Sequence, residues 1–218
     1  YRRYETGNLR KDGRIGFPQP TGKLELLSTT VETFHPGSGM ELPMHIEPPE
    51  SPISKPELYE EYPLICITGR RIPVYFHNEH RQLPWCRENW PVPLVEINPK
   101  TAAKLGIKQG DWVWIESPYG RVRQTADLYA GVAENVINAE HLWWYPEAPS
   151  PEKGSQYSEI NRLVNKDAQC PICGATCLRG YPVKVYKAVE GAPEGIITSA
   201  KDPRLREWLP LSEAEIRG

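Results

Sequence analysis

A short apolar run that ends in a polar turn is the feature that most constrains this chain. Residues 63–67 (PLICI) are long enough for one buried β-strand, and they lead directly into Thr68, Gly69, Arg70 and Arg71. Gly69 allows a sharp turn or a close approach to a ligand. A hydroxyl group, exposed backbone N–H groups and two guanidinium groups at the end of a buried strand suit a phosphate. The stretch therefore predicts an anion site, although similar turns also occur in ordinary surface hairpins.

A second polar run follows a few residues later. Residues 77–82 (HNEHRQ) lie between the aromatic neighbours Tyr75, Phe76 and Trp85. The run has too many donors and acceptors for a core, and its flanks are too aromatic for a simple solvated loop. Alone, it fits a polar loop without a ligand. Together with the turn at residues 68–71, it favours an anion or nucleotide site.

Charge and composition exclude several broad classes. The 218 residues carry a net charge of −2, which gives no general electrostatic case for nucleic-acid or membrane partners, so an anion site has to be local. No apolar run approaches the roughly 20 residues of a membrane span, and we recognise no signal peptide. Residue 1 is Tyr rather than Met, so we expect a piece of a larger chain whose compartment the sequence does not reveal.

The periodicity predicts a mainly β protein with one or two short helices. The expected strands cover residues 24–28, 63–67, 91–97, 112–116, 121–128, 131–138 and 183–187. Residues 98–106 carry the signals of a short helix, with Asn98 as N-cap, Pro99 at the first position and Gly106 as the stop. Its buried side is expected to hold Ala102, Ala103, Leu105 and Ile107. The proline-rich residues 35–63 predict an extended segment without a core of its own.

Two further motifs leave alternatives open. Trp143, Trp144 and Tyr145 follow His141, and three adjacent aromatic residues either stack on a flat heterocycle or close one end of the fold. Cys170, Cys173 and Cys177 have C-x2-C-x3-C spacing, which can bind zinc or a cluster if a fourth ligand is present. We expect free thiols there, with a metal site as the alternative. The odd number of cysteines argues against a disulfide scaffold.

Several of these motifs occur in an order that resembles a known family. The segments FPQPTGKLELLS, TGRR…YFHNEHRQLPWCRE, INPKTAAKLGIKQGDWVWIESPYGRV, His-x-Trp-Trp-x-Pro and Asn-x-Leu are similar to the C-terminal cofactor-binding domain of molybdenum and tungsten bis-pterin oxidoreductases, the dimethyl sulfoxide reductase superfamily. The resemblance covers roughly residues 15–188. It is strongest to the branch of formate-dehydrogenase-like, thiosulfate- or polysulfide-reductase-like and acetylene-hydratase-like enzymes.

The resemblance implies a fold and a domain plan. The fold would be a double-psi β-barrel with short helices and a proline-rich N-terminal extension. Residues 1–58 would be a crossing segment from upstream domains, residues 59–190 the molybdopterin-dinucleotide-binding barrel, and residues 191–218 a tail. Residues 212–215 of that tail could start a short helix.

The resemblance also implies a cofactor and partners. The domain would bind bis(molybdopterin guanine dinucleotide) with molybdenum or tungsten, while a 4Fe-4S cluster and the metal's protein ligand would lie in the absent part of the enzyme. We expect no catalytic or metal-ligating residue here, and no turnover from the isolated domain. The partners would be the remaining domains and an iron–sulfur electron-transfer subunit. The implied cofactor-binding residues are Thr68, Gly69, Arg70, Arg71, His77, Glu79, His80, Arg81, Gln82, Asn98, His141 and Asn161.

Two rival functions are compatible with the same residues. A stand-alone β-barrel that binds nucleotides or single-stranded nucleic acid would use the arginine and aromatic residues, but it lacks a basic face. A small cysteine-metal protein would depend on residues 170–177. The substrate, the choice of molybdenum or tungsten, the axial metal ligand and the partner subunits depend on residues outside this chain.

Overall fold

The chain divides into two units, of which one contains the β-sheet. The computed structural model describes residues 2–69 and 72–207. One unit consists of Glu47–Cys170 and Ala175–Gly218, and the other of Tyr1–Ile46 and Pro171–Gly174.

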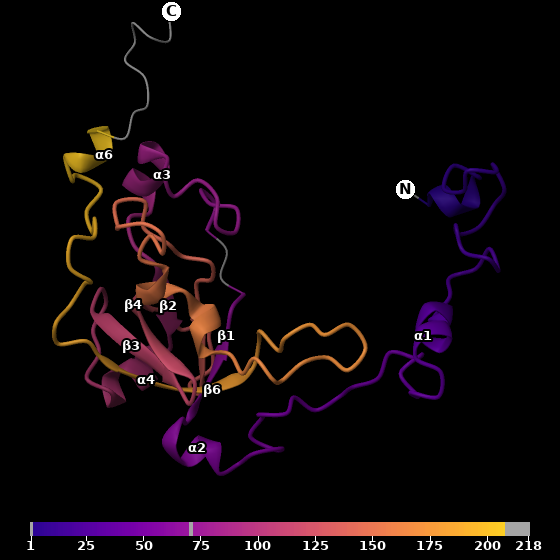
Figure 1. Cartoon of the computed structure of the whole chain (residues 1–218), viewed down its shortest axis with the longest axis horizontal. Coiled ribbons are helices and arrows are strands. Elements are labelled where there is room, and N and C mark those ends of the chain that lie inside the picture. Colours follow the sequence, from indigo (N-terminus) through magenta and orange to yellow (C-terminus); the bar gives the residue numbers. More distant parts are fainter. Residues whose placement is uncertain (1, 70–71, 208–218) are drawn as a thin grey trace, which may run out of the picture. The chain divides into compact units, whose positions relative to one another are not determined.

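Six short strands close into a barrel in the order β1-β5-β2-β4-β3-β6 (Figure 1). Two pairs, β1 with β5 and β2 with β4, are parallel, and the other four pairs are antiparallel. This closed barrel confirms the mainly β, double-psi fold that the family resemblance implied. The strands are β1 (Leu64–Ile67), β2 (Leu94–Ile97), β3 (Trp112–Ser117), β4 (Gly120–Leu128), β5 (Val136–Ala139) and β6 (Tyr181–Lys187).

Alternation along the strands builds the core of the barrel. Side chains in a strand point in turn to opposite faces, so every second residue faces the interior. Val113 and Ile115 of β3 are fully buried, as are Val122 and Ala126 of β4 and Ile137 of β5. The strands predicted at residues 112–116 and 121–128 are therefore confirmed as β3 and β4, and branched aliphatic side chains fill much of the barrel interior.

The helix that begins after β2 has the capping predicted for it. In α4 (Pro99–Lys104), the Asn98 side chain accepts a hydrogen bond from the Lys100 backbone N–H. Gly106 follows the C-cap with a φ of +66°. The buried face predicted for α4 is correct for two of its four residues. Ala102 and Ile107 are buried, whereas Ala103 and Leu105 are exposed. With fewer than two turns, α4 places a single narrow face against the barrel, and these two side chains point away from it.

The other helices are short, and most had no sequence prediction. Helix α3 begins at a proline in the first position, which is a favourable start that the polar and aromatic surroundings obscured. Helices α3 and α6 lie side by side beyond one end of the barrel (Figure 1). The remaining elements are α1 (Thr29–Phe34), α2 (Leu58–Glu61), α3 (Pro84–Asn89), α5 (Ser155–Ser158), α6 (Arg204–Glu207) and the 3-10 helices η1 (Arg3–Glu5) and η2 (Ile160–Leu163).

Three strand predictions are wrong in part or whole. Strand β2 begins at Leu94 rather than at residue 91, because Pro91 and Pro93 have no backbone N–H to donate to a ladder. Residues 24–28 form no strand, because alternation alone does not make a strand without a neighbour to pair with. Strand β5 begins at Val136 rather than at residue 131, since the Val136 N–H bonds to the Ala133 carbonyl in a turn. The short helix expected at residues 212–215 lies outside the described residues.

The N-terminal unit lacks a buried apolar core. Within residues 2–46 only Gly7 is classed as buried. Local contacts order parts of the segment, such as the stacked rings of Tyr4 and Phe17 at 4.9 Å and the Ser28 cap of α1. Many of its large apolar side chains are exposed to solvent, among them Ile15, Leu24, Leu26, Phe34, Leu42, Met44 and Ile46. None of the helices in the described part of the chain combines the length and apolar character that a bilayer crossing requires.

A buried carboxylate fixes the last part of the proline-rich segment to the barrel. Glu50 is buried, and its side chain accepts hydrogen bonds from the Tyr119 hydroxyl and from the Asn165 amide at 2.9 Å. The Tyr59 hydroxyl donates to the Glu50 carbonyl at 3.1 Å. The extended segment therefore packs on the β3–β4 hairpin before it leads into β1.

Candidate functional site

Strand pairing brings the first predicted turn next to the end of β5. Ile67 of β1 pairs with Asn138 of β5, so the turn at Thr68 and Gly69 begins beside Asn138. The Gly69 N–H donates to the Asn138 side-chain oxygen at 3.0 Å, and the Thr68 hydroxyl donates to the Leu178 carbonyl at 3.1 Å. Both groups predicted to meet a phosphate are thus hydrogen-bonded within the chain. Arg70 and Arg71, the other two residues of the predicted anion site, lie outside the described residues.

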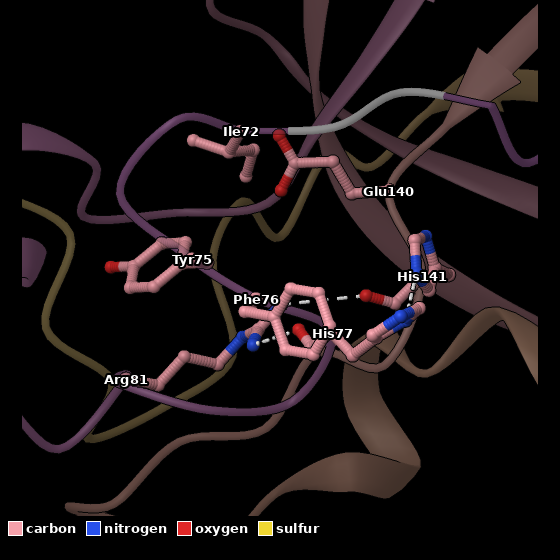
Figure 2. A pocket seen from close by; sticks show the side chains of 7 residues that line it. All are labelled: Ile72, Tyr75, Phe76, His77, Arg81, Glu140 and His141. Carbon is pink, nitrogen blue, oxygen red and sulfur yellow. Dashed lines mark hydrogen bonds between the residues drawn. The ribbon is translucent and has the colours of Figure 1, made fainter. Parts of the chain in front are cut away.

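The loop after β1 and the loop after β5 form a small open pocket. Figure 2 shows the side chains that line it: Ile72, Tyr75, Phe76, His77, Arg81, Glu140 and His141. Three predicted site residues, His77, Arg81 and His141, meet here although the first and the last are separated by 64 positions. The pocket holds about 40 Å³, whereas pockets that enclose a small ligand typically hold about 300–1,000 Å³. The pocket is therefore too small to enclose a ligand by itself.

The two histidines of the pocket are in contact through their rings. Nδ1 of His77 lies 3.2 Å from Nε2 of His141, and the ring planes meet at 66°. At this distance one nitrogen donates and the other accepts, so the pair needs at least one neutral imidazole. The ring-to-ring contact joins the loop after β1 to the loop after β5.

Arg81 lies beneath this pair and is almost fully buried, with 2% of its surface exposed. Its guanidinium donates to the His77 carbonyl at 2.5 Å and to the His141 carbonyl at 3.4 Å (Figure 2). It also lies over the rings of Tyr75 and Trp143, at 4.8 and 4.7 Å from their centroids. Burial lowers the pKa of Arg81 to about 10, although the nearby carboxylates of Glu140 and Glu159 oppose that shift.

Strained backbone conformations are concentrated in the same two loops. His77 and His80 have φ of +51° and +72°, and Leu142, directly after His141, has φ of +56°. Left-handed backbone is uncommon for residues with a side chain, and such strain is found more often at functional sites than elsewhere. The strained positions lie next to the residues that line the pocket.

The sequence analysis did not identify Glu140, a carboxylate in the pocket. Its side chain is 1% exposed and accepts a hydrogen bond from Trp90 Nε1 at 3.0 Å. Gln124, also buried, holds the Glu140 backbone through both its amide nitrogen and its amide oxygen. In Figure 2 the carboxylate points toward Ile72 and away from the two imidazoles. Its position next to His141, directly after a strand, was the only signal that the sequence offered.

A second missed carboxylate lies behind the pocket. Burial raises the pKa of Glu159, while hydrogen bonds from the backbones of Asn161 and Leu142 and the charge of Arg81 oppose the shift. Its contacts join the loop of His141 to η2.

Other predicted site residues lie apart from the pocket lining. Glu79, His80 and Gln82 are exposed on the loop that carries His77, and none of them lines the pocket. Asn98 caps α4, and its amide also donates to the Val132 carbonyl at 2.7 Å. Asn161 is exposed on η2, where its backbone N–H bonds to Glu159.

The aromatic run after His141 closes one end of the fold. Trp143 and Tyr145 are fully buried in a cluster with Ile72. Behind them Arg87, also buried, forms two hydrogen bonds to the Glu147 carboxylate, at 3.0 and 3.2 Å. The rings of Trp143 and Tyr145 therefore pack inside the fold and are not available as a surface on which a heterocycle could stack.

The cysteines form no disulfide among the described residues. Over residues 2–69 and 72–207, no three His, Cys, Asp or Glu side chains are grouped so that they could hold a metal ion. Burial raises the pKa of the Cys66 thiol to about 12, which makes it an unreactive side chain of the core.

The family is shown by the sequence itself. Residues 64–182, which span the barrel from β1 into β6 and include both pocket loops, match the family model of the molydopterin dinucleotide binding domain. The chain belongs to this family. Its relatives place it in the dimethyl sulfoxide reductase superfamily, as the motif order implied.

Enzymes are among the relatives of this molybdopterin domain. The chain is 49% identical to dopamine dehydroxylase from Eggerthella lenta, over 98% of the chain and 24% of that protein. It is 36% identical to acetylene hydratase from Syntrophotalea acetylenica, over 71% of the chain and 20% of that protein. A solved structure of acetylene hydratase from Pelobacter acetylenicus superposes with a TM-score of 0.70 and 31% identity, covering 83% of the chain and 25% of that structure. The chain thus spans about a quarter of the length of these relatives.

Proposed function

We propose that this chain binds bis(molybdopterin guanine dinucleotide) as the C-terminal domain of a larger molybdenum or tungsten enzyme. The observation that carries the proposal is the pocket of His77, Arg81 and His141, which lies within the residues matched by the family model. When bound, the cofactor supplies the metal chemistry. The chain holds and orients the organic part and provides the polar surroundings.

The chemistry of the pocket suits the edge of a pterin or guanine ring. Such an edge needs hydrogen-bond donors and acceptors, and the exposed His77 offers one at Nε2, the ring nitrogen that does not contact His141. Phe76 presents a ring at the pocket rim that is 57% exposed, a surface on which a flat heterocycle can pack. Thr68, Gly69, Arg70 and Arg71 remain our candidates for the phosphates, and Glu79, His80, Gln82, Asn98 and Asn161 for further polar contacts.

The small size of the pocket fits a domain that forms only one wall of its ligand site. About 40 Å³ cannot enclose a dinucleotide, so further walls have to come from other parts of the enzyme. Relatives about four times as long have room for such parts. We place there the metal ligand and a 4Fe-4S cluster, and we expect the domain alone to be inactive.

Among the reaction types that this superfamily allows, we favour reductive removal of a hydroxyl group from an aromatic substrate. The support is the 49% identity to dopamine dehydroxylase over 98% of the chain. Hydration, as in acetylene hydratase, is the second candidate, on lower identity. Formate-dehydrogenase-like and thiosulfate- or polysulfide-reductase-like activities, which the motifs also allowed, have less support among the relatives described above.

The test is the cofactor content of the intact gene product. We expect two pterins per molybdenum or tungsten, measured as oxidised pterin by fluorescence and as metal by mass spectrometry. His77→Ala and His141→Ala should each lower the pterin content, whereas His35→Ala, in the N-terminal unit, should leave it unchanged. A folded product free of pterin and metal would overturn the proposal and return attention to a simple nucleotide site.

A further inference from the structure

Arg81 connects the two loops that carry the histidine pair. Its two terminal nitrogens donate to the carbonyls of His77 and His141, at 2.5 and 3.4 Å. These two residues are 64 positions apart, so this single side chain bridges segments that the sequence separates widely. Figure 2 shows dashed lines from the guanidinium to both carbonyl oxygens.

The guanidinium is fixed in orientation as well as in position. Its central carbon lies 4.8 and 4.7 Å from the ring centroids of Tyr75 and Trp143, two rings that meet edge to face at 89°. Contact with two perpendicular rings restricts how the guanidinium can turn, and its planar fork directs two N–H donors at the carbonyls. A lysine ammonium has the same charge but neither the plane nor the fork.

Burying this charge is unfavourable unless it is compensated. Arg81 is 2% exposed, and its Nε has no hydrogen-bond partner in the described part of the chain. An apolar side chain of similar volume would fill the same space without that desolvation. Compared with such an apolar side chain, the guanidinium adds two hydrogen bonds to the backbone carbonyls of His77 and His141. We therefore look for the function of Arg81 in these two bonds.

The two carbonyls belong to the residues whose rings meet above them. His77 has a left-handed backbone, and so does Leu142, the neighbour of His141. Backbone strain of this kind persists only where the surroundings hold it in place. By holding both carbonyls, Arg81 supports the two backbone positions that set the 3.2 Å distance between the imidazoles.

We propose that Arg81 is a positioning residue that makes His77 and His141 a coupled pair sharing one proton at the mouth of the pocket. The charged groups nearest the pair are Arg81, which bonds to both backbone carbonyls, and Glu140, which lines the same pocket with its carboxylate turned toward Ile72; the charges of Glu140 and Glu159 both act on Arg81. The geometric part of this inference stands alone. What the pair does for a ligand rests on the proposed cofactor site. There the two histidines would act as one unit that shares a proton, and not as two rings that carry charge independently.

A histidine titration tests the coupling without any cofactor. In the 218-residue chain, NMR of the ring nitrogens should show the two rings taking up protons in two coupled steps, because the second proton breaks the ring-to-ring bond. Removing either partner, by His77→Ala or His141→Ala, should shift the titration of the other. Arg81→Lys and Arg81→Met should leave two rings that titrate independently.

Arg87 provides a matched control. It is equally buried and lies 5.9 Å from the Trp143 ring, but its guanidinium bonds to Glu147 and to the Ile197 carbonyl. Arg87→Lys should therefore lower stability and preserve the coupling. Coupling that persists in a folded Arg81→Lys or Arg81→Met protein would overturn the proposal, as would equal loss of coupling in Arg87→Lys.

If neither Arg81 variant folds, the single-histidine variants decide. Unchanged titration of His141 in His77→Ala would show that the pair is not coupled, and would refute the inference. Because these measurements use the chain without cofactor, they remain informative even if the pterin assay of the intact enzyme fails.

Discussion

Gly69 occupies a position where the fold of this chain does not itself require glycine. Its φ lies outside the left-handed region, and among the described residues an added Cβ would meet only the Asn138 side-chain oxygen, at 3.7 Å. That distance is an ordinary van der Waals contact. The space beside Gly69 is thus open to a partner outside the chain, which is where we place a cofactor phosphate.

Gly69→Ala should therefore separate folding from binding. We expect a change in the free energy of unfolding of less than about 0.5 kcal/mol, because no atom has to move. In the intact enzyme, the pterin content should fall, because the methyl group would occupy the space assigned to the ligand. Urea unfolding and pterin fluorescence measure the two effects.

The control is Gly120→Ala. There an added Cβ would lie 2.9 Å from the Arg162 carbonyl oxygen, a backbone atom that cannot move freely. Overpacking of this kind costs about 1–3 kcal/mol. If Gly69→Ala destabilised the chain as much as Gly120→Ala, or left the pterin content unchanged, Gly69 would have no ligand role.

The residue scale also shows where sequence reasoning about the site reached its limit. His77 and His141 were identified from polar and aromatic patterns, and the pocket brings them together. Arg81 was expected to line the cofactor because of the family resemblance; in the structure it is buried against Tyr75 and Trp143, and its guanidinium bonds to backbone carbonyls. Trp143 is 62 positions away in the sequence, and no local pattern reveals such a neighbour.

Among the elements, those defined by local signals were the most predictable. Asn98, Pro99 and Gly106 mark α4 because capping and stop signals act within a few residues. The start of β5 was predicted too early. The limits of a strand depend on the strands that pair with it, and the partners of β5, β1 and β2, are distant in the sequence. The segment at residues 24–28 alternates like a strand but has no neighbour to pair with.

Substitutions at Asn98 can distinguish its role as the cap of α4 from a role in binding the cofactor. Asn98→Ala removes the cap on Lys100 and the bond to the Val132 carbonyl, so we expect a loss of about 1 kcal/mol or somewhat more in unfolding free energy. Asn98→Asp keeps the capping oxygen and should recover part of that loss. If pterin content fell in the Asp variant while stability was kept, Asn98 would be a cofactor contact, as the family resemblance implied.

Asp111 connects the turn before β3 to β6 and makes stability depend on pH. Its carboxylate accepts from the Lys108 backbone N–H at 2.8 Å and from the Lys187 ammonium at 2.9 Å. These contacts lower the pKa of Asp111 below its usual value. A carboxyl with a lowered folded-state pKa stabilises the fold above its unfolded pKa of about 3.9, and this contribution is lost as the pH falls through the folded value.

Asp111→Asn should therefore be less stable than the wild type at pH 7, by about 1 kcal/mol or less for a partly exposed pair. The difference should shrink as the pH falls below about 4, where the wild-type carboxyl takes up its proton. Urea unfolding at pH 7, 5 and 3 measures it. A difference that stayed constant over this range would mean that the loss comes from the turn and not from the charge.

At the scale of the whole molecule, the barrel and the N-terminal unit differ in how they hold their apolar side chains. Every member of the two buried clusters lies between Leu64 and Ile196. Periodicity along the sequence predicted a mainly β chain, but the closure and mixed strand order of the barrel came from the resemblance. Long-range pairing such as β1 with β5 leaves no mark on local alternation.

The N-terminal unit keeps large apolar side chains in solvent, with Leu26 69% and Phe34 74% exposed. Exposed apolar side chains in such number are typical of a surface that binds protein. We assign that partner to the remaining part of the proposed larger enzyme, which agrees with the crossing segment expected for residues 1–58.

Two measurements examine this assignment. A chain that starts at Glu47 should unfold at nearly the same temperature as the 218-residue chain, because the barrel core draws its side chains from later residues. Leu26→Ser with Phe34→Ser should not change the stability of the 218-residue chain, but should destabilise the intact enzyme, where we expect these side chains to be buried. A control pair, Glu32→Gln with Thr33→Ser, changes neighbouring exposed polar residues and should leave the stability of both the 218-residue chain and the intact enzyme unchanged.

If the intact enzyme tolerated the apolar replacements as well as the control pair, residues 1–46 would have no docking role. A large drop in the unfolding temperature of the shortened chain would show instead that the barrel itself depends on them.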